Sequence, residues 1–329
     1  MERIGDATDI TLLDDWQRDF PIDPRPFAVI GSAIGCPEEE VLNRLDVLHA
    51  SGRITRVGAT CAPNTVSAST LAALSAPDEV LEQVAEFVGS RAGVNHSYLR
   101  ENRWNLWFVA TGPNRDHVDA VLNEIRDETG LVVLDLPLVR PFNVDLGFKL
   151  RGNSRETPVA RPVDLDRLKE GDCEILQALT TGMPLSSRPF GDIASKLDRS
   201  EQGVLDRVKD LQEAGIISRL GVIVRHRALG WRSNAMVVWD ISSERIDAAG
   251  PALAALPGVT LCYERRPVEN VWPYRLYCMI HAQSRPRALD TLTEASNLPE
   301  LEGVKFKTLF SSRCFKQTGA MIARTGAAA

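Results

Sequence analysis

Residues 25–58 read RPFAVIGSAIGCPEEEVLNRLDVLHASGRITRVG, and residues 188–221 repeat the pattern as RPFGDIASKLDRSEQGVLDRVKDLQEAGIISRLG. The two stretches belong to a longer match without a gap, which runs from Asp9 to Gly58 and contains seventeen identities. It resumes downstream, where Gly93-Val94 matches Gly258-Val259. Self-similarity of this extent predicts two homologous halves of about 150 residues each.

Each half opens with a pattern typical of a winged helix-turn-helix. The third predicted helix follows Pro37 in the first half and Ser200 in the second, because proline suits a first helical turn and serine an N-cap. Gly52 and Gly215 stand where a helix end is expected. The predicted helices cover 10–16, 27–34 and from 37 onward, and then 173–179, 190–197 and from 200 onward. Strand-like runs follow at 54–59 and 216–224 and would form the wings.

The remainder of each half alternates strand, helix, strand, strand, helix, strand, which is the ferredoxin-like order. The first half has strands near 67–74, 94–101, 104–111 and 131–139, with helices near 78–89 and 114–128. The second half has strands near 234–240, 258–265, 272–281 and 303–310, with helices near 244–255 and 285–297. Such a sheet leaves one face free of helices, so two halves are expected to pair sheet to sheet and enclose a space.

The predicted fold class is therefore α+β, with two tandem copies of a winged helix-turn-helix and a ferredoxin-like (βαββαβ) domain. A polar segment with Gly and Pro, RGNSRETPVAR at 151–161, reads as a linker. The predicted divisions are 1–62 (winged helix), 63–150 (αβ domain), 151–168 (linker), 169–228 (second winged helix) and 229–329 (second αβ domain).

Composition narrows the class of protein. The chain has 329 residues and a formal net charge of -6, which counts against nucleic acid as the main partner. No run of 18 apolar residues occurs, and Met1 to Thr11 lacks the apolar core of a secretory signal. The six cysteines form no CxxC pair, so we expect reduced thiols in a cytoplasmic protein and no zinc or iron–sulfur site.

The layout of a winged helix joined to a ferredoxin-like domain resembles the Lrp/AsnC transcription regulators, and two halves would form a pseudo-dimer of that type. The motifs resemble a branch that became enzymes, the siroheme decarboxylases, which occur as two related subunits or as one fused chain. The motifs are NHSYLRE (95–101), GVIVRHRALGW (221–231), VTLCYERR (259–266), VWPYRLYCMIH (271–281) and LFSSRCFK (309–316).

This resemblance implies the non-oxidative removal of the acetate carboxyls at ring positions 12 and 18 of siroheme. The product would be 12,18-didecarboxysiroheme, in heme d1 or alternative heme biosynthesis, and the fusion favours heme d1. The substrate is itself an iron tetrapyrrole, so no further cofactor and no protein-held metal are expected. Siroheme and its product are the expected partners. Self-association and other proteins of the pathway stay open, and neither DNA nor a membrane is expected.

Decarboxylation builds negative charge on an exocyclic carbon, which the conjugated macrocycle delocalises. The protein must supply cations for the carboxylates that stay, a poorly solvated pocket for the one that leaves, and a proton donor.

His96, Tyr98 and Arg100 are spaced by two, so on a strand they share one face. Polar groups on one face suggest a ligand surface. The second half repeats the pattern with Tyr263 and Arg265, although leucine replaces the histidine. His96 is the first candidate for proton donor or iron ligand, and the alternative is a structural or surface histidine.

Arg225-His226-Arg227 closes the second wing, whereas the first half has Ala62-Pro63-Asn64 there. Such a cationic trio suits carboxylates, and histidine titrates near neutral pH. The alternative is contact with a DNA backbone or a solvated basic wing. Because each half keeps a histidine that the other lacks, we expect two diverged pockets, of which one is catalytic.

Further candidates are weaker. Arg140, Arg313 and Lys316 follow the last strands and could clamp carboxylates, or could be exposed charges at strand ends. Trp104 and Trp272 could stack on the macrocycle, although the core of the sheet is the more frequent place for such residues.

Two other functions compete with the enzyme. A DNA-binding regulator would read DNA with its third helix, but that helix begins Glu38-Glu39-Glu40, and its counterpart contains Glu201 and Asp206. These carboxylates repel phosphates. A tetrapyrrole-binding sensor or carrier without catalysis is the other alternative.

Overall fold

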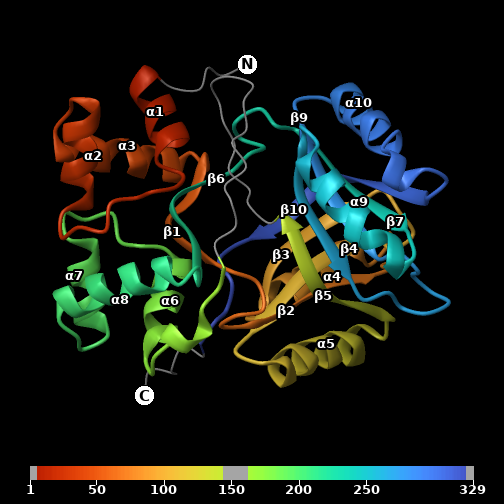
Figure 1. The fold of residues 1–329 in the computed structure, drawn as a ribbon. Helices are drawn as coiled ribbons and strands as arrows, with labels where there is room; N and C mark the ends of the chain where they lie inside the picture. The colour runs from red at the N-terminus through yellow and green to blue at the C-terminus, as the bar shows by residue number, and fades with distance from the viewer. Residues whose placement is uncertain (1–5, 144–161, 324–329) are drawn as a thin grey trace. The chain divides into compact units, whose positions relative to one another are not determined.

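A computed structural model describes residues 6–143 and 162–323 of the chain (Figure 1). The chain divides into two compact units, and each unit combines a part of both halves. Of the described residues, the helical unit comprises 6–67, 162–229 and 318–323, and the barrel unit comprises 68–143 and 230–317. The linker predicted at 151–161 lies outside the described residues.

The helical unit contains the six predicted helices and the two predicted strands. The first half supplies α1 (Ala7–Asp15), α2 (Pro26–Ile34), α3 (Glu38–Ala50) and β1 (Ile54–Cys61). The second supplies a 3-10 turn (Leu165–Arg167), α6 (Asp172–Thr181), α7 (Pro189–Lys196), α8 (Glu201–Glu213) and β6 (Ile217–Val224). Gly52 and Gly215 follow α3 and α8 with φ of 69° and 68°, as the predicted helix ends require.

The wing strands of the two halves pair with each other. β1 and β6 form a two-stranded antiparallel sheet in which Gly58 lies opposite Gly221. Backbone hydrogen bonds also join the two halves next to this sheet. Val222 N–H donates to the carbonyl of Trp16 at 2.7 Å, and Met183 N–H donates to the carbonyl of Val57 at 2.8 Å. Each half therefore completes the other's wing.

Close backbone approach explains why the same glycine stands in both repeats. A Cβ at Gly58 would overlap the carbonyl oxygen of Leu179, and a Cβ at Gly221 would overlap the backbone of Gln17. Only glycine lets the chain of the other half pass at this distance.

The barrel unit has the predicted ferredoxin-like order twice. The first half supplies β2 (Ala68–Leu74), α4 (Leu81–Ser90), β3 (Val94–Arg100), β4 (Leu106–Gly112), α5 (Arg115–Thr129) and β5 (Val133–Asn143). The second supplies β7 (Ser233–Asp240), α9 (Ser243–Ala255), β8 (Val259–Arg265), β9 (Leu276–Ala282), α10 (Arg285–Ser296), a 3-10 turn (Pro299–Leu301) and β10 (Lys305–Gln317). No helix in these described ranges is long and apolar enough to cross a bilayer.

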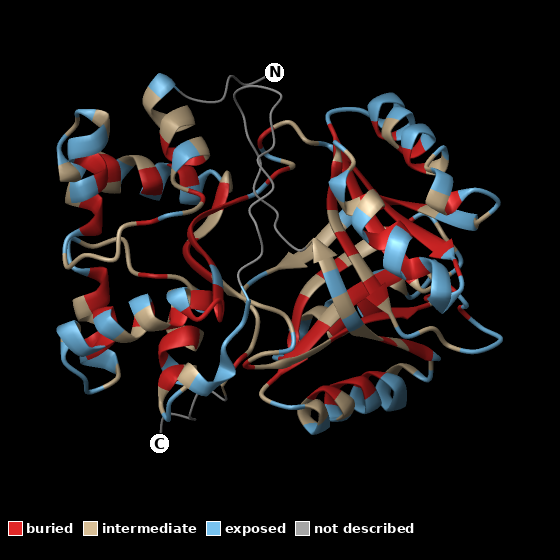
Figure 2. Ribbon diagram, viewed as in Figure 1, coloured by how far each residue is buried: buried red, intermediate tan, exposed pale blue. Residues whose placement is uncertain are grey.

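The two sheets join edge to edge into one closed barrel of order β10-β3-β4-β2-β5-β8-β9-β7. The long strands β5 and β10 make the junctions, since each pairs with a strand of its own half and with one of the other half. Helices cover the outer face over two apolar cores, and buried residues line the strands (Figure 2).

The expectation of an open space between the sheets is wrong for much of the barrel. A third core fills the interior, and large aromatic side chains supply much of it, among them Trp107, Trp272 and Tyr277. Their rings leave little room because the interior of a small barrel is just wide enough for side chains to fill.

Candidate active site

The predicted polar triplet of the first half faces the barrel interior. On β3, His96 and Tyr98 lie opposite Val109 and Trp107 of β4, which belong to the interior core. The alternation of the strand puts Arg100 on the same side. The shared face predicted for these three residues is confirmed.

The second half repeats this arrangement on β8. Leu261 and Tyr263 lie opposite Met279 and Tyr277, again residues of the interior core. Arg265 follows two positions later. Both halves thus direct a tyrosine and an arginine into one barrel, and the first half adds a histidine.

Both arginines lie over tyrosine rings. The guanidinium carbon of Arg100 is 5.5 Å from the centre of the Tyr98 ring, and that of Arg265 is 4.8 Å from the centre of the Tyr263 ring. The His96 ring stacks on Tyr98 with centres 6.4 Å apart and planes inclined by 22°. Nη1 of Arg265 also donates to the carbonyl of Leu136 at 2.8 Å, which fixes the guanidinium in place.

The interior disfavours charge, so the arginines there are strong ligands for an anion. Burial lowers the pKa of Arg265. Burial also raises the pKa of the Tyr263 hydroxyl, while the charges of Arg265 and Arg100 oppose that rise. The charges of one arginine from each half therefore act on the Tyr263 hydroxyl. A carboxylate bound by either arginine lies in a medium of low polarity, where the attraction between opposite charges is stronger than in water.

Arg100 contacts Asn234, which in turn contacts His281, and neither residue was predicted from the sequence. Nη1 of Arg100 donates to Oδ1 of Asn234 at 3.3 Å, and Nδ2 of Asn234 lies 2.8 Å from Nε2 of His281. His281 continues the alternation of the inward-facing Tyr277 and Met279 on β9. That alternation is the signal that could have identified it.

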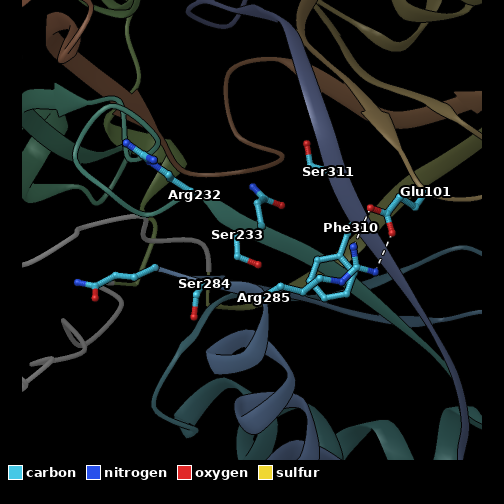
Figure 3. Close-up of a pocket in the computed structure, with 9 residues that line it drawn as sticks. Glu101, Arg232, Ser233, Ser284, Arg285, Phe310 and Ser311 are labelled. Atoms are coloured by element: carbon cyan, nitrogen blue, oxygen red, sulfur yellow. Dashed lines mark hydrogen bonds and ion pairs between the residues drawn. The ribbon is translucent and has the colours of Figure 1, made fainter. Parts of the chain in front are cut away.

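A pocket of about 200 Å³ opens beside this network (Figure 3). Arg285 crosses it, with its guanidinium over the Phe310 ring and bonds of 2.9 and 2.8 Å to the Glu101 carboxylate. The volume lies below the range of about 300–1,000 Å³ that encloses a drug-sized ligand. A space of this size admits a small polar group but not a large flat ring. The lining residues are Glu101, Arg232, Ser233, Asn234, Gln283, Ser284, Arg285, Phe310 and Ser311.

The second predicted histidine lies in the helical unit. His226 is 6% exposed and sits in the turn after β6, where its carbonyl accepts from Leu229 N–H at 3.1 Å. Arg225 and Arg227 flank it, and Arg225 N–H donates to the carbonyl of Arg53 at 2.8 Å. The trio thus belongs to an ordered turn, whereas His96 belongs to the barrel unit.

The three predicted clamps already have partners next to the outer helices. Arg140 pairs with Asp247 of α9 and donates from Nε to Glu264 at 2.7 Å. Arg313 pairs with Glu82 of α4, and Nζ of Lys316 donates to the carbonyl of Gly89 at 2.7 Å. These contacts favour the alternative of structural charges at strand ends.

The predicted stacking residues lie in or against the interior core. Trp272 is 2% exposed, packs against Trp107 and Tyr274, and donates from Nε1 to the Tyr277 hydroxyl at 2.7 Å. Trp104 is half-buried, and its carbonyl accepts from Nε1 of Trp107 at 2.6 Å. Trp272 therefore presents no open face, while the partly exposed Trp104 stays a candidate.

The third helices of the helical unit offer few cations to a phosphate backbone. Arg44 of α3 binds Asp6, Asp9 and Glu40 at 2.7 to 2.9 Å. Arg207 of α8 binds Asp172 at 2.6 Å and Asp210 at 2.7 Å. These ion pairs occupy the arginines that DNA recognition would need.

Models of known protein families match the residues of both the barrel unit and the helical unit. A model of the AsnC-like ligand binding domain matches residues 66–143 and 228–316, and a model of the siroheme decarboxylase NirDL-like HTH domain matches 9–54 and 172–217. The chain is 53% identical to the siroheme decarboxylase NirDL subunit of Paracoccus pantotrophus, over 98% of this chain and 99% of that protein.

The chain belongs to the NirDL-type siroheme decarboxylases. The crystal structure of a siroheme decarboxylase NirDL superposes with a TM-score of 0.68 at 26% identity, covering 96% of this chain and 94% of that one. A second crystal structure, of NirDL in complex with an iron-uroporphyrin III analogue, superposes with a TM-score of 0.65 at 26% identity, covering 92% of this chain and 90% of that one. The separate NirD subunit of Stutzerimonas stutzeri is 46% identical over 44% of this chain and 95% of its own length. A NirDL-type chain is thus about twice as long as this single subunit.

Proposed function

We propose that this chain is a siroheme decarboxylase that converts siroheme to 12,18-didecarboxysiroheme. The observation that carries the proposal is similarity to NirDL subunits along almost the whole chain, at 53% identity. The relative in complex with an iron-uroporphyrin III analogue supports a tetrapyrrole with many carboxylates as substrate.

The inward-facing cations would hold such a substrate. Arg100, which is buried, and Arg265, which is half-buried, bind carboxylates that stay on the macrocycle, and the low polarity around them makes each ion pair stronger than it would be in water. Tyr98 and Tyr263 support the two guanidinium groups through their ring faces. Arg225 and Arg227, in the turn after β6, stay candidate ligands for carboxylates.

In the reaction, the bond between the acetate methylene and its carboxylate breaks and carbon dioxide leaves. The electron pair stays on the exocyclic carbon and is delocalised by the conjugated ring, so no separate cofactor is needed. A proton then adds to that carbon, and the acetate becomes a methyl group. His96 and His226 are the candidate donors of this proton, one in each half of the chain. The alternative role for His96 is as a ligand of the substrate iron.

The cellular setting follows from the same proposal. None of the six cysteines, all of which lie in the described part of the chain, forms a disulfide, which suits a reducing compartment such as the cytoplasm. The product would pass to later enzymes of heme d1 biosynthesis, and self-association would add to the internal pairing of the two halves.

An anaerobic assay with purified full-length chain and siroheme tests the proposal. We expect two successive products, each lighter by one carbon dioxide, as resolved by liquid chromatography and mass spectrometry. Spectral binding of siroheme with unchanged mass would establish the carrier instead. A specific, salt-dependent shift of upstream DNA without turnover would establish the regulator.

A further inference from the structure

The buried chain of side chains behind Arg100 has one consistent hydrogen-bond pattern. Thr260, His281 and Asn234 come from β8, β9 and β7 of the second half, and each is 3% exposed. Arg100 comes from β3 of the first half and is 6% exposed. These four side chains therefore link the two halves inside one barrel.

The direction of each bond follows from the Arg100 end, because a guanidinium can only donate. Oδ1 of Asn234 accepts from Arg100, so Nδ2 of Asn234 donates to Nε2 of His281, and the proton of the neutral ring is on Nδ1. The Thr260 oxygen then accepts at its 2.6 Å contact with Nδ1, and its own proton goes to the carbonyl of Met279, 3.0 Å away.

The other ring nitrogen of His281 has the opposite role. In the neutral imidazole, Nε2 carries no proton and accepts a hydrogen bond from Nδ2 of Asn234 at 2.8 Å. This contact turns Oδ1 of the same amide toward Nη1 of Arg100, 3.3 Å away. If the Asn234 amide were turned over, its NH₂ group would face the Arg100 guanidinium, and both groups are donors. Nε2 of His281 would then face the amide oxygen and would have no hydrogen bond to accept.

We propose that neutral His281 is a positioning residue that orients Asn234 and, through it, the Arg100 guanidinium that receives a substrate carboxylate. This inference rests on the proposed function. The carbonyl of Leu309 supports the same Nη1 atom at 3.2 Å, so the guanidinium is held from two strands. Asn234 also lines the pocket of Figure 3, so the network extends from Arg100 to that pocket.

In the described part of the first half, a threonine stands at the position that His281 has in this network. Thr111 of β4 is the counterpart of His281, because Leu106 and Leu276 begin the two strands. Its hydroxyl donates to the carbonyl of Gly93 at 3.3 Å. Thr111 is buried as well, at 4% exposed, so Thr111→Val is a matched control that removes a polar group without touching Arg100.

The test compares His281→Leu, His281→Gln and Asn234→Ala in the full-length chain. We expect His281→Leu to raise KM for siroheme about fivefold with kcat nearly unchanged, because one neutral hydrogen bond is lost. His281→Gln keeps an acceptor for the Asn234 amide and should recover most of the affinity. Asn234→Ala breaks the same link from the other side and must give a comparable loss, even if His281→Leu fails to fold.

A double variant separates positioning from a structural role. Once Arg100→Gln has removed the guanidinium, His281→Leu should change KM no further. Additive losses, an equal loss in Thr111→Val, or full affinity in both His281→Leu and Asn234→Ala would overturn the proposal. Siroheme binding to the same variants is measured by absorption titration, which separates a failure of the proposed function from a failure of the positioning role. A wild type that binds but does not decarboxylate refutes the function, whereas unchanged binding in the variants refutes the positioning role.

Discussion

The guanidinium of Arg265 lies over the ring of Tyr263, two residues earlier on β8, at 4.8 Å from the ring centre. Arg100 and Tyr98 repeat this relationship on β3 of the other half. We expect Arg100→Gln and Arg265→Gln each to raise KM for siroheme about 30-fold, because a hydrogen bond to a charged group is worth about 2 kcal/mol. Steady-state kinetics under anaerobic conditions measure this effect.

Arg313→Gln is the matched control for those variants. Arg313 is also an arginine on a barrel strand, but it pairs with exposed Glu82 of α4, and exposed ion pairs contribute little. Its KM should stay within about twofold of the wild type. An equal loss in Arg313→Gln would mean that net charge, not the inward face, governs binding.

The two candidate proton donors make a separate prediction. His96→Ala and His226→Ala should each lower kcat by about 100-fold or more, since general acid catalysis contributes at least that much. Thermal unfolding should stay close to wild type for both. His49→Gln, at the exposed end of α3, serves as the control and should turn over normally. Full decarboxylation by both alanine variants would refute the assignment of these roles.

The glycine pair of the wings predicts a stability effect. Gly58→Ala and Gly221→Ala should each lower the free energy of unfolding by about 2 kcal/mol, because the new methyl group meets the backbone of the other half. Gly89→Ala in α4 has open space around it and should be neutral or stabilising. Denaturant titrations compare the three variants, and equal stability in all of them would contradict the close approach.

Buried thiols predict how stability changes in alkaline solution. Burial raises the pKa of Cys278 to about 12, from a usual value of 9.0. The folded state therefore favours the protonated thiol, and this contribution is complete below about pH 9 and is lost as the pH approaches 12. We expect the free energy of unfolding to fall across that window, and to fall less steeply in Cys278→Ala. Ready alkylation of native Cys278 near neutral pH would contradict this burial.

The repeat made most of the fold predictable. Regular spacing of apolar residues and the caps at Ser200, Gly52 and Gly215 placed the helices within a few residues of their observed bounds. The closed barrel was not predictable, because the β5–β8 and β10–β3 pairings join the two halves by backbone hydrogen bonds that carry no local pattern.

The candidate site was predictable only in part. Spacing by two put His96, Tyr98 and Arg100 on one face, and that face is the barrel interior. Residue type alone suggested clamps at Arg140 and Arg313, but carboxylates on α9 and α4 already bind them. The alternation on β9 could have placed His281 on the inward face, but its partners Asn234 and Thr260 lie on two other strands and follow no local pattern.

Labelled siroheme gives the most direct test of the central claim, that this chain removes two acetate carboxyls and leaves the other carboxylates in place. Siroheme carrying ¹³C in its acetate carboxyls is incubated anaerobically with the purified chain, and the gas and the tetrapyrrole are analysed by mass spectrometry. We predict two labelled carbon dioxide molecules for each siroheme, with the remaining acetate label retained in the product. Release of unlabelled carbon dioxide, or recovery of siroheme with all of its label, would contradict the account.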